Sequence, residues 1–185
     1  CDELGMVVWA EIPFISRFIN TKEAKEDTVR QVRELIMQNY NHPSICFWGI
    51  SNEITMGEES DELVENQRIL QKLCHKLDPS RKTVLANLTT VESQSEQNKI
   101  TDLSAYNVYM GWYAGKVEDC GAWMDSLHKE NSDMCMGISE YGADTNVQYH
   151  SDAPKRQDYT EEYQSYYHEK MLQAIQERPY LWCSF

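Results

Sequence analysis

The chain has 185 residues, of which 30 are acidic and 17 are basic, and its formal net charge is −13. That length corresponds to one domain or to part of a larger one, and a hydrophobic content of 41% is too high for a disordered tail. The acidic excess argues against nucleic acid as a partner, and no apolar run approaches the roughly 20 residues of a membrane helix, so we expect no membrane partner.

The first elements of the chain are a strand, a helix and a second strand. An apolar run over residues 6–9 predicts the first strand. Asn20 then opens a predicted helix as its N-cap, with Glu23 three residues later as the capping-box partner. The Asn-His-Pro segment at residues 41–43 ends this helix. Residues 44–49 form a continuous apolar run, as expected for a strand that is buried on both faces.

The same alternation continues to the end of the chain. Ser60 can cap a second helix, which ends at the Asp-Pro dipeptide of residues 78–79, and Thr160 can cap a last helix that runs to about Arg178. A third helix is predicted over residues 116–130, although Gly121 lies inside it. Further strands are predicted over residues 83–88, 103–109 and 134–139, and another begins at residues 181–185.

Strands that alternate with helices predict repeated β-α units and a parallel sheet, and therefore the α/β class. The chain contains neither G-x-G-x-x-G nor G-x-x-x-x-G-K-[ST], so nucleotide-binding forms of such a sheet lose support. The remaining common option is a (β/α)₈ TIM barrel, which needs eight strands and usually about 250 residues. With six predicted strands, the chain is interpreted as part of such a barrel.

Two glutamates stand at the carboxyl ends of predicted strands, where a barrel places its active site. Glu53 ends the stretch SICFWGISNE, and Glu140 ends MGISE. Two carboxyl groups across one pocket are what glycoside hydrolysis needs. The alternative, that each glutamate is a solvated residue at a strand end, has equal weight on these residues alone.

Six cysteines are scattered along the chain, without a C-x-x-C pair or a histidine at zinc spacing. Cys46, Cys135 and Cys183 lie in short apolar runs, which favours buried free thiols over a disulfide framework. We expect no structural metal and no redox role. Free thiols suit the cytoplasm, and buried ones would also tolerate a bacterial periplasm, so the compartment is left open.

Four segments resemble glycoside hydrolase family 2, the β-galactosidase and β-glucuronidase family. NHPSICFWGISNE (residues 41–53) is similar to the acid/base signature of the family, and GISEYGAD (137–144) to its nucleophile signature. LDPSRKT (77–83) is similar to a helix-to-strand connector, and YNVYMGWY (106–113) to the sixth strand. The four segments occur in the order of the family, and the likeness spans nearly the whole chain.

The resemblance implies about strands three to eight of the TIM barrel and a retaining mechanism. In that mechanism Glu53 is the general acid/base and Glu140 is the nucleophile, with the two carboxyl groups about 5–5.5 Å apart. Asn52 is implied to bind the 2-hydroxyl of the sugar, and Tyr109 to orient the nucleophile. Trp112 is implied to lie on the pocket wall.

Glu11, at the end of the first predicted strand, is a further candidate for binding the substrate. Metal-dependent members of the family have Glu-x-His here, whereas this chain has Glu11-Ile12-Pro13, so we predict no magnesium site and no cofactor. Trp48, inside the second strand, is expected to be a core residue. His42 is expected to hold a turn.

The resulting hypothesis is a retaining glycoside hydrolase that cleaves terminal β-linked sugars, with β-galactosides preferred. The alternatives are a β-glucuronidase of the same family and a non-catalytic carbohydrate-binding fragment. We interpret residues 1–185 as one piece of a catalytic domain, without the flanking β-sandwich domains and the first two barrel strands. Open strand edges predict self-association into a homo-oligomer. We also hypothesise that the isolated piece is inactive.

Overall fold

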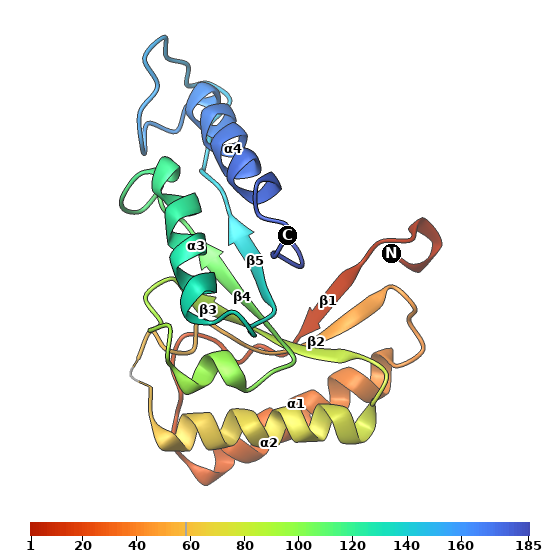
Figure 1. Ribbon diagram of the computed structural model, residues 1–185. Coiled ribbons are helices and arrows are strands. Elements are labelled where there is room, and N and C mark those ends of the chain that lie inside the picture. Colours follow the sequence, from red (N-terminus) through yellow and green to blue (C-terminus); the bar gives the residue numbers. More distant parts are fainter. Residues whose placement is uncertain (58) are drawn as a thin grey trace. The chain divides into compact units, whose positions relative to one another are not determined.

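The structure is a computed structural model that describes residues 1–57 and 59–185 (Figure 1). The described chain has five β-strands and four α-helices, which alternate except that a 3-10 turn takes the place of a helix between β3 and β4. The chain divides into two compact units, Cys1–Ala105 (unit 1) and Tyr106–Phe185 (unit 2). Parallel strands that alternate with helices confirm the predicted α/β class and its assignment to part of a TIM barrel.

Unit 1 contains three complete strands and two long helices. β1 pairs with β2 and β2 pairs with β3, both in parallel, and β3 is followed in the sheet by β4. The elements in chain order are β1 (Val8–Glu11), α1 (Lys22–Asn39), β2 (Ile45–Asn52), α2 (Asp61–Leu77), β3 (Lys82–Leu88), a 3-10 turn (Glu96–Lys99) and the start of β4 (Leu103–Val108). The first strand therefore begins and ends two residues later than predicted.

The two helices of unit 1 begin at polar caps. The hydroxyl oxygen of Ser60 accepts a hydrogen bond from the backbone N–H of Leu63, as predicted for α2. For α1 the predicted cap, Asn20, is wrong by one residue. Thr21 has the extended backbone of an N-cap, and its hydroxyl oxygen accepts from the N–H of Ala24.

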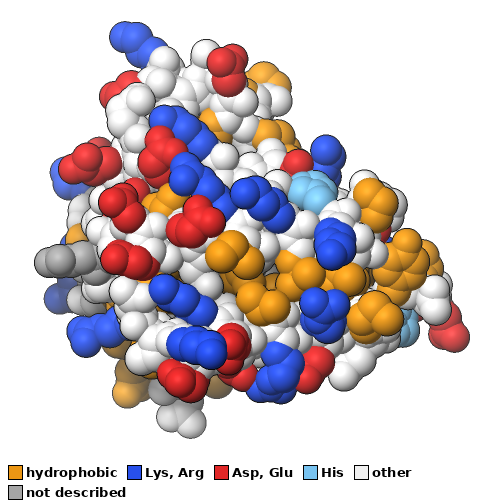
Figure 2. All heavy atoms as spheres, turned by 90° about the horizontal axis from the view of Figure 1, so that it is seen from below, with side chains coloured by type: hydrophobic (Ala, Val, Ile, Leu, Met, Phe, Trp, Pro, Cys, Tyr) orange, Lys and Arg blue, Asp and Glu red, His pale blue; other side chains and the backbone are white. Residues whose placement is uncertain are grey.

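Helices α1 and α2 lie side by side and cover one face of β1–β3 (Figure 1). Their apolar stripes meet the strand residues Trp48 and Ile50 in one core, to which α1 contributes Val32 and α2 contributes Leu70. Trp48 is 1% exposed, which confirms that it is a core residue. On the outer face of the two helices, hydrophobic side chains lie among charged ones (Figure 2).

A buried carboxylate, Asp78, organises the LDPSRKT segment (residues 77–83) of unit 1. Asp78 accepts hydrogen bonds from Trp48 Nε1 (3.0 Å), from Arg81 Nη1 (2.7 Å) and from the backbone N–H of Ser80 (3.0 Å). Burial opposes ionisation of this carboxyl, but the hydrogen bonds outweigh it and lower its pKa to about 2. Arg81 also donates to the carbonyl oxygens of Ile45 and His42, so one segment ties together the ends of both helices.

Unit 2 contains the end of β4 and the elements that follow it. These are a 3-10 turn (Val117–Asp119), α3 (Cys120–Glu130), β5 (Met136–Tyr141) and α4 (Glu161–Gln176). The end of β4 neighbours β5 in the sheet. The third helix is thus shorter than predicted, because residues 117–119 form a 3-10 turn. The strand predicted over residues 134–139 begins two residues later.

Thr160 caps α4 as predicted, since its hydroxyl oxygen accepts from the N–H of Tyr163. The strand predicted to begin at residues 181–185 is present as a single parallel bridge between Ile138 and Ser184. Burial was predicted for Cys135, but this thiol is exposed, while Cys183 is half-buried. In residues 1–57 and 59–185, no helix is long and apolar enough to cross a membrane.

Candidate active site

In unit 1, the end of β2 carries Asn52 and is followed directly by Glu53. The backbone of Glu53 has φ = +48°, a left-handed conformation that is uncommon for a residue other than glycine. The N–H of Glu53 donates to the carbonyl oxygen of Ala86 at the end of β3 (2.9 Å). Such strained positions persist only where their surroundings hold them, and they cluster at functional sites.

The segment that follows β1 also holds the end of β2. The N–H of Asn52 donates to the carbonyl oxygen of Phe14 (3.0 Å), and the carbonyl oxygen of Asn52 accepts from the N–H of Ser16 (3.2 Å). Ser16 itself has φ = +64°. The backbone on which Asn52 lies is therefore fixed by hydrogen bonds to β3 on one side and to the chain after β1 on the other.

Glu11 is the last residue of β1 and is half-buried. Its carboxylate accepts a hydrogen bond from Trp9 Nε1 (3.1 Å). Gly49 lies opposite Glu11 in the register of β1 and β2. A Cβ atom at Gly49 would overlap Trp9 Nε1 and lie 2.7 Å from Glu11 Cβ. Only glycine leaves room for these two side chains, a role that the sequence analysis missed although a glycine inside a strand signals a close approach.

In unit 2, Tyr109 follows the end of β4 and Glu140 lies near the end of β5. The hydroxyl of Tyr109 donates a hydrogen bond to Glu140 Oε2 (2.8 Å). The contact that the resemblance implied between these two residues is therefore present. A hydroxyl at this distance binds an ionised carboxylate more strongly than it binds a neutral acceptor, and it fixes which oxygen points away from it.

The residue before Glu140 anchors the same strand. The hydroxyl of Ser139 donates to Asn107 Oδ1 on β4 (2.6 Å), and Asn107 is buried. Trp112 is 2% exposed, and its ring packs edge-on against Tyr159, with 5.1 Å between the ring centroids. The structure thus gives Trp112 a packing position in the core of unit 2, and its contact with a sugar stays a prediction.

The structure brings the predicted residues together within each unit. Unit 1 has Glu11, Asn52 and Glu53 on the ends of two paired strands, and unit 2 has Tyr109 and Glu140 in direct contact. Among the residues that the structure describes, no three His, Cys, Asp or Glu side chains lie together as a metal site.

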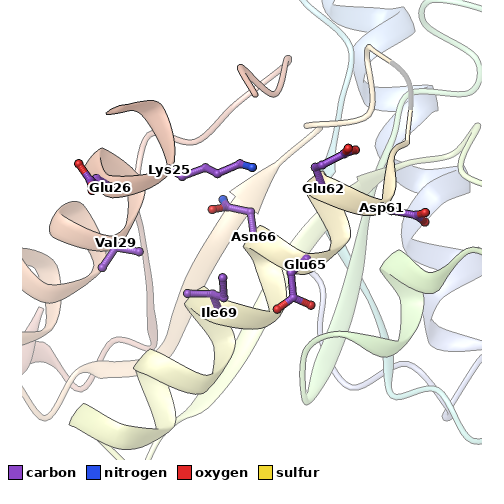
Figure 3. A pocket seen from close by; sticks show the side chains of 8 residues that line it. All are labelled: Lys25, Glu26, Val29, Asp61, Glu62, Glu65, Asn66 and Ile69. Carbon is purple, nitrogen blue, oxygen red and sulfur yellow. The ribbon is translucent and has the colours of Figure 1, made fainter. Parts of the chain in front are cut away.

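A groove of about 420 Å³ lies elsewhere in unit 1, between the outer faces of α1 and α2 (Figure 3). Val29 and Ile69 form its apolar part, and four carboxylates and Lys25 surround them. None of the predicted site residues lines this groove. Catalysis in an α/β fold takes place at the carboxyl ends of the strands, so the groove is not the candidate active site.

Carboxylates at the ends of parallel strands, one of them held by a tyrosine, are typical of the barrels that hydrolyse glycosides. Comparison with known proteins agrees with this class. The family "Glycosyl hydrolases family 2, TIM barrel domain" matches residues 1–180. The chain therefore belongs to glycosyl hydrolase family 2, as the four sequence motifs indicated.

Individual relatives match the whole chain. It is 36% identical to a β-glucuronidase of Bacteroides fragilis, over 100% of this chain and 27% of the relative. The crystal structure of an FMN-binding β-glucuronidase from Facaelibacterium prausnitzii L2-6 has 53% identity and a TM-score of 0.97, over 100% of this chain and 29% of that chain. A putative β-galactosidase from B. fragilis has 33% identity and a TM-score of 0.89, over 100% and 28%. The chain thus spans less than a third of the length of these relatives.

Proposed function

We propose that the protein is a retaining glycoside hydrolase that acts on terminal β-linked sugars, and that its substrates are β-glucuronides. The observation that carries the hydrolase proposal is the hydrogen bond from Tyr109 to Glu140 at the end of β5. It supports Glu140 as a nucleophile whose carboxylate is held in one orientation. Because the chain spans less than a third of its relatives, the activity is proposed for the complete gene product that contains these residues.

In the proposed mechanism, Glu140 attacks the anomeric carbon while Glu53 donates a proton to the leaving oxygen. The bond to the leaving group breaks, and a covalent glycosyl-enzyme forms on Glu140. Glu53, now ionised, takes a proton from water, which attacks the anomeric carbon and releases Glu140. Asn52 binds the 2-hydroxyl of the sugar, a contact that strengthens in the transition state. Glu11 and Trp112 are proposed to line the pocket.

The choice of sugar depends on the relatives. The residues of the motifs favoured β-galactosides. This substrate class remains the second candidate because a putative β-galactosidase is 33% identical to the chain. The relative at 36% and the structure at 53% identity are both β-glucuronidases and match the whole chain, so glucuronides have more support.

A homo-oligomer is also proposed, and light scattering of the purified protein measures its oligomeric state.

The sugar is tested by comparing two substrates with the same leaving group. We expect the complete gene product to hydrolyse p-nitrophenyl β-glucuronide with a higher kcat/KM than p-nitrophenyl β-galactoside. The reverse order would replace the glucuronide proposal with the galactoside one. Hydrolysis of neither would contradict both, and would favour the carbohydrate-binding alternative.

The catalytic roles are tested by variants and by trapping. Glu53→Gln is expected to lower kcat by about 100-fold or more, since a general acid–base group contributes roughly 10² to 10⁴. Glu140→Gln removes the nucleophile and should lower kcat at least as much. Glu62→Gln, on the exposed start of α2, is the matched control. A 2-deoxy-2-fluoro glycosyl fluoride of the preferred sugar should form an adduct on the peptide that contains Glu140. An adduct on any other carboxylate would overturn the assignment of the nucleophile.

A further inference from the structure

One extra residue lies in β2 just before the candidate acid/base. Gly49 pairs with Val84 of β3 and Asn52 pairs with Ala86, so three steps along β2 correspond to two along β3. This is a β-bulge, in which two consecutive side chains can face the same side of the sheet. Bulges are frequent next to active sites, where they change the direction of a side chain.

The side chains within the bulge both face the helix layer. Ile50 is buried in the core that α1 and α2 form over the strands. Ser51 is 1% exposed, and its Oγ accepts a hydrogen bond from Nε2 of Gln67 on α2 (2.9 Å). Regular alternation would place Ser51 on the face of Gly49 and turn Asn52 away from it. The bulge places Ser51 on the helix side, so that Asn52 follows on the face of Gly49.

Gln67 belongs to a larger polar cluster behind the strand ends. The same Nε2 also donates to Oε1 of Gln97 in the 3-10 turn before β4 (2.9 Å). The next residue, Asn98, accepts through Oδ1 from Nδ2 of Asn87 on β3 (3.1 Å). The cluster therefore links the bulge of β2 to α2, and the turn before β4 to β3.

Stability alone is a poor explanation for this cluster. Gln67 and Gln97 are both fully buried. Within residues 1–57 and 59–185, Gln67 Oε1 and Gln97 Nε2 have no hydrogen-bond partner. Buried polar atoms without partners cost stability, and apolar side chains of similar shape would avoid that cost. Departures from well-satisfied packing are expected where a structure serves a function.

We propose that Ser51 and Gln67 are positioning residues for Glu53, an inference that rests on the proposed function of Glu53 as acid/base. The hydrogen bond from Gln67 fixes Ser51 in the bulge, and the bulge fixes the strained backbone of Glu53 two residues later. Without this bond, the turn from Asn52 to Glu53 relaxes and the Glu53 carboxyl group moves away from the leaving oxygen, while the backbone hydrogen bonds of Asn52 to Phe14 and Ser16 keep Asn52 in place. A displacement of about 1 Å is enough to lower a rate by roughly 100-fold.

The test uses two leaving groups on the preferred sugar. A phenyl glycoside needs protonation of its leaving oxygen, whereas a 2,4-dinitrophenyl glycoside does not. In the complete gene product, Gln67→Met and Ser51→Ala should each lower kcat/KM for the phenyl glycoside by about tenfold or more, part of the usual contribution of a general acid. The kcat/KM for the dinitrophenyl glycoside, which reports only formation of the glycosyl-enzyme, should change less than about twofold, since that step then needs no acid.

A double variant and a control separate positioning from a general structural effect. Ser51→Ala and Gln67→Met both remove the bond between these two side chains, and Gln67→Met also removes the bond to Gln97, so the double variant should be no slower than Gln67→Met alone. Asn66→Leu is the matched control, since Asn66 is a buried amide on α2 whose Nδ2 donates to the hydroxyl of Thr28 on α1. This control should leave kcat/KM unchanged for both glycosides.

Several results would overturn the proposal. These are an equal fall for both leaving groups, multiplicative effects in the double variant, or unchanged kinetics in a folded Ser51→Ala variant. A crystal structure of Ser51→Ala gives a readout that does not depend on activity, since Glu53 should leave its left-handed conformation. An unchanged Glu53 there would overturn the proposal. Wild-type protein that hydrolyses neither sugar would instead contradict the proposed function, and the crystal structure would still decide the role of Ser51.

Discussion

The contact between Tyr109 and Glu140 makes a quantitative prediction about the nucleophile. Tyr109→Phe removes one oxygen atom and keeps the ring, which packs edge-on against Tyr113 with 5.3 Å between the ring centroids. The substitution removes the hydrogen bond from the hydroxyl to Glu140 Oε2, which is 2.8 Å long. The carboxylate then rotates more freely and spends less time in the orientation for attack.

The size of the effect follows from the type of bond. A hydrogen bond to a charged group contributes about 1.5–3 kcal/mol. Tyr109 and Glu140 are both half-buried, so water can partly replace the hydroxyl. The lower end of this energy range therefore applies. About 1.5 kcal/mol corresponds to roughly a tenfold lower rate, because 1.36 kcal/mol is one factor of ten.

Two assays measure this effect. Steady-state hydrolysis of an aryl glycoside gives kcat and kcat/KM, and trapping by the 2-fluoro sugar reports attack by Glu140 without the later hydrolysis step. Both should fall by about tenfold in Tyr109→Phe. Tyr113→Phe is the control, since its side chain is 65% exposed, and it should leave both rates unchanged. If Tyr109→Phe is folded and traps the inhibitor as fast as the wild type, the proposed orientation of Glu140 is refuted.

Two further predictions concern the stability of unit 1, measured by thermal and denaturant unfolding of the complete gene product. Gly49→Ala would force a Cβ onto Trp9 and should lower the free energy of unfolding by about 1–3 kcal/mol, whereas Gly57→Ala, with space for its Cβ, should have little effect. Asp78→Asn leaves the side chain of Arg81, 15% exposed, without its carboxylate and should cost about 3–5 kcal/mol. Since hydrogen bonds outweigh burial and hold the pKa of Asp78 at about 2, its stabilisation is present above about pH 4 and lost toward pH 2. A wild-type acid unfolding curve identical to that of Asp78→Asn would contradict this role.

Local chemistry made part of the fold predictable. Ser60 and Thr160 were predictable as helix caps because a capping hydrogen bond spans only three residues. Asn20 and Thr21 both have side chains that can cap a helix. The same reasoning therefore could not distinguish them, and it predicted Asn20 where the structure has Thr21. Which of two adjacent caps is used depends on the path by which the chain enters the helix.

The positions of the candidate catalytic residues were also readable from the sequence. Glu53 and Glu140 follow apolar runs that are long enough to be buried strands, and they lie at the ends of β2 and β5 in the structure. Their roles came from the resemblance to a family, because spacing alone did not distinguish a catalytic glutamate from a solvated one. The contact of Tyr109 with Glu140 was likewise implied only by that resemblance.

Only the tertiary structure showed what holds these residues in place. Gly49 must be glycine because side chains of the neighbouring strand occupy its Cβ position, which depends on strand register. The bulge at Ser51 adds one residue to β2 without changing its apolar pattern, and Gln67 lies 16 residues further on in a helix. Hydrophobic patterns record which residues are buried and capping residues record where helices begin, because both act over a few residues. Register, bulges and buried hydrogen bonds between elements depend on chain segments far apart in sequence, so they were decided only when the elements packed together.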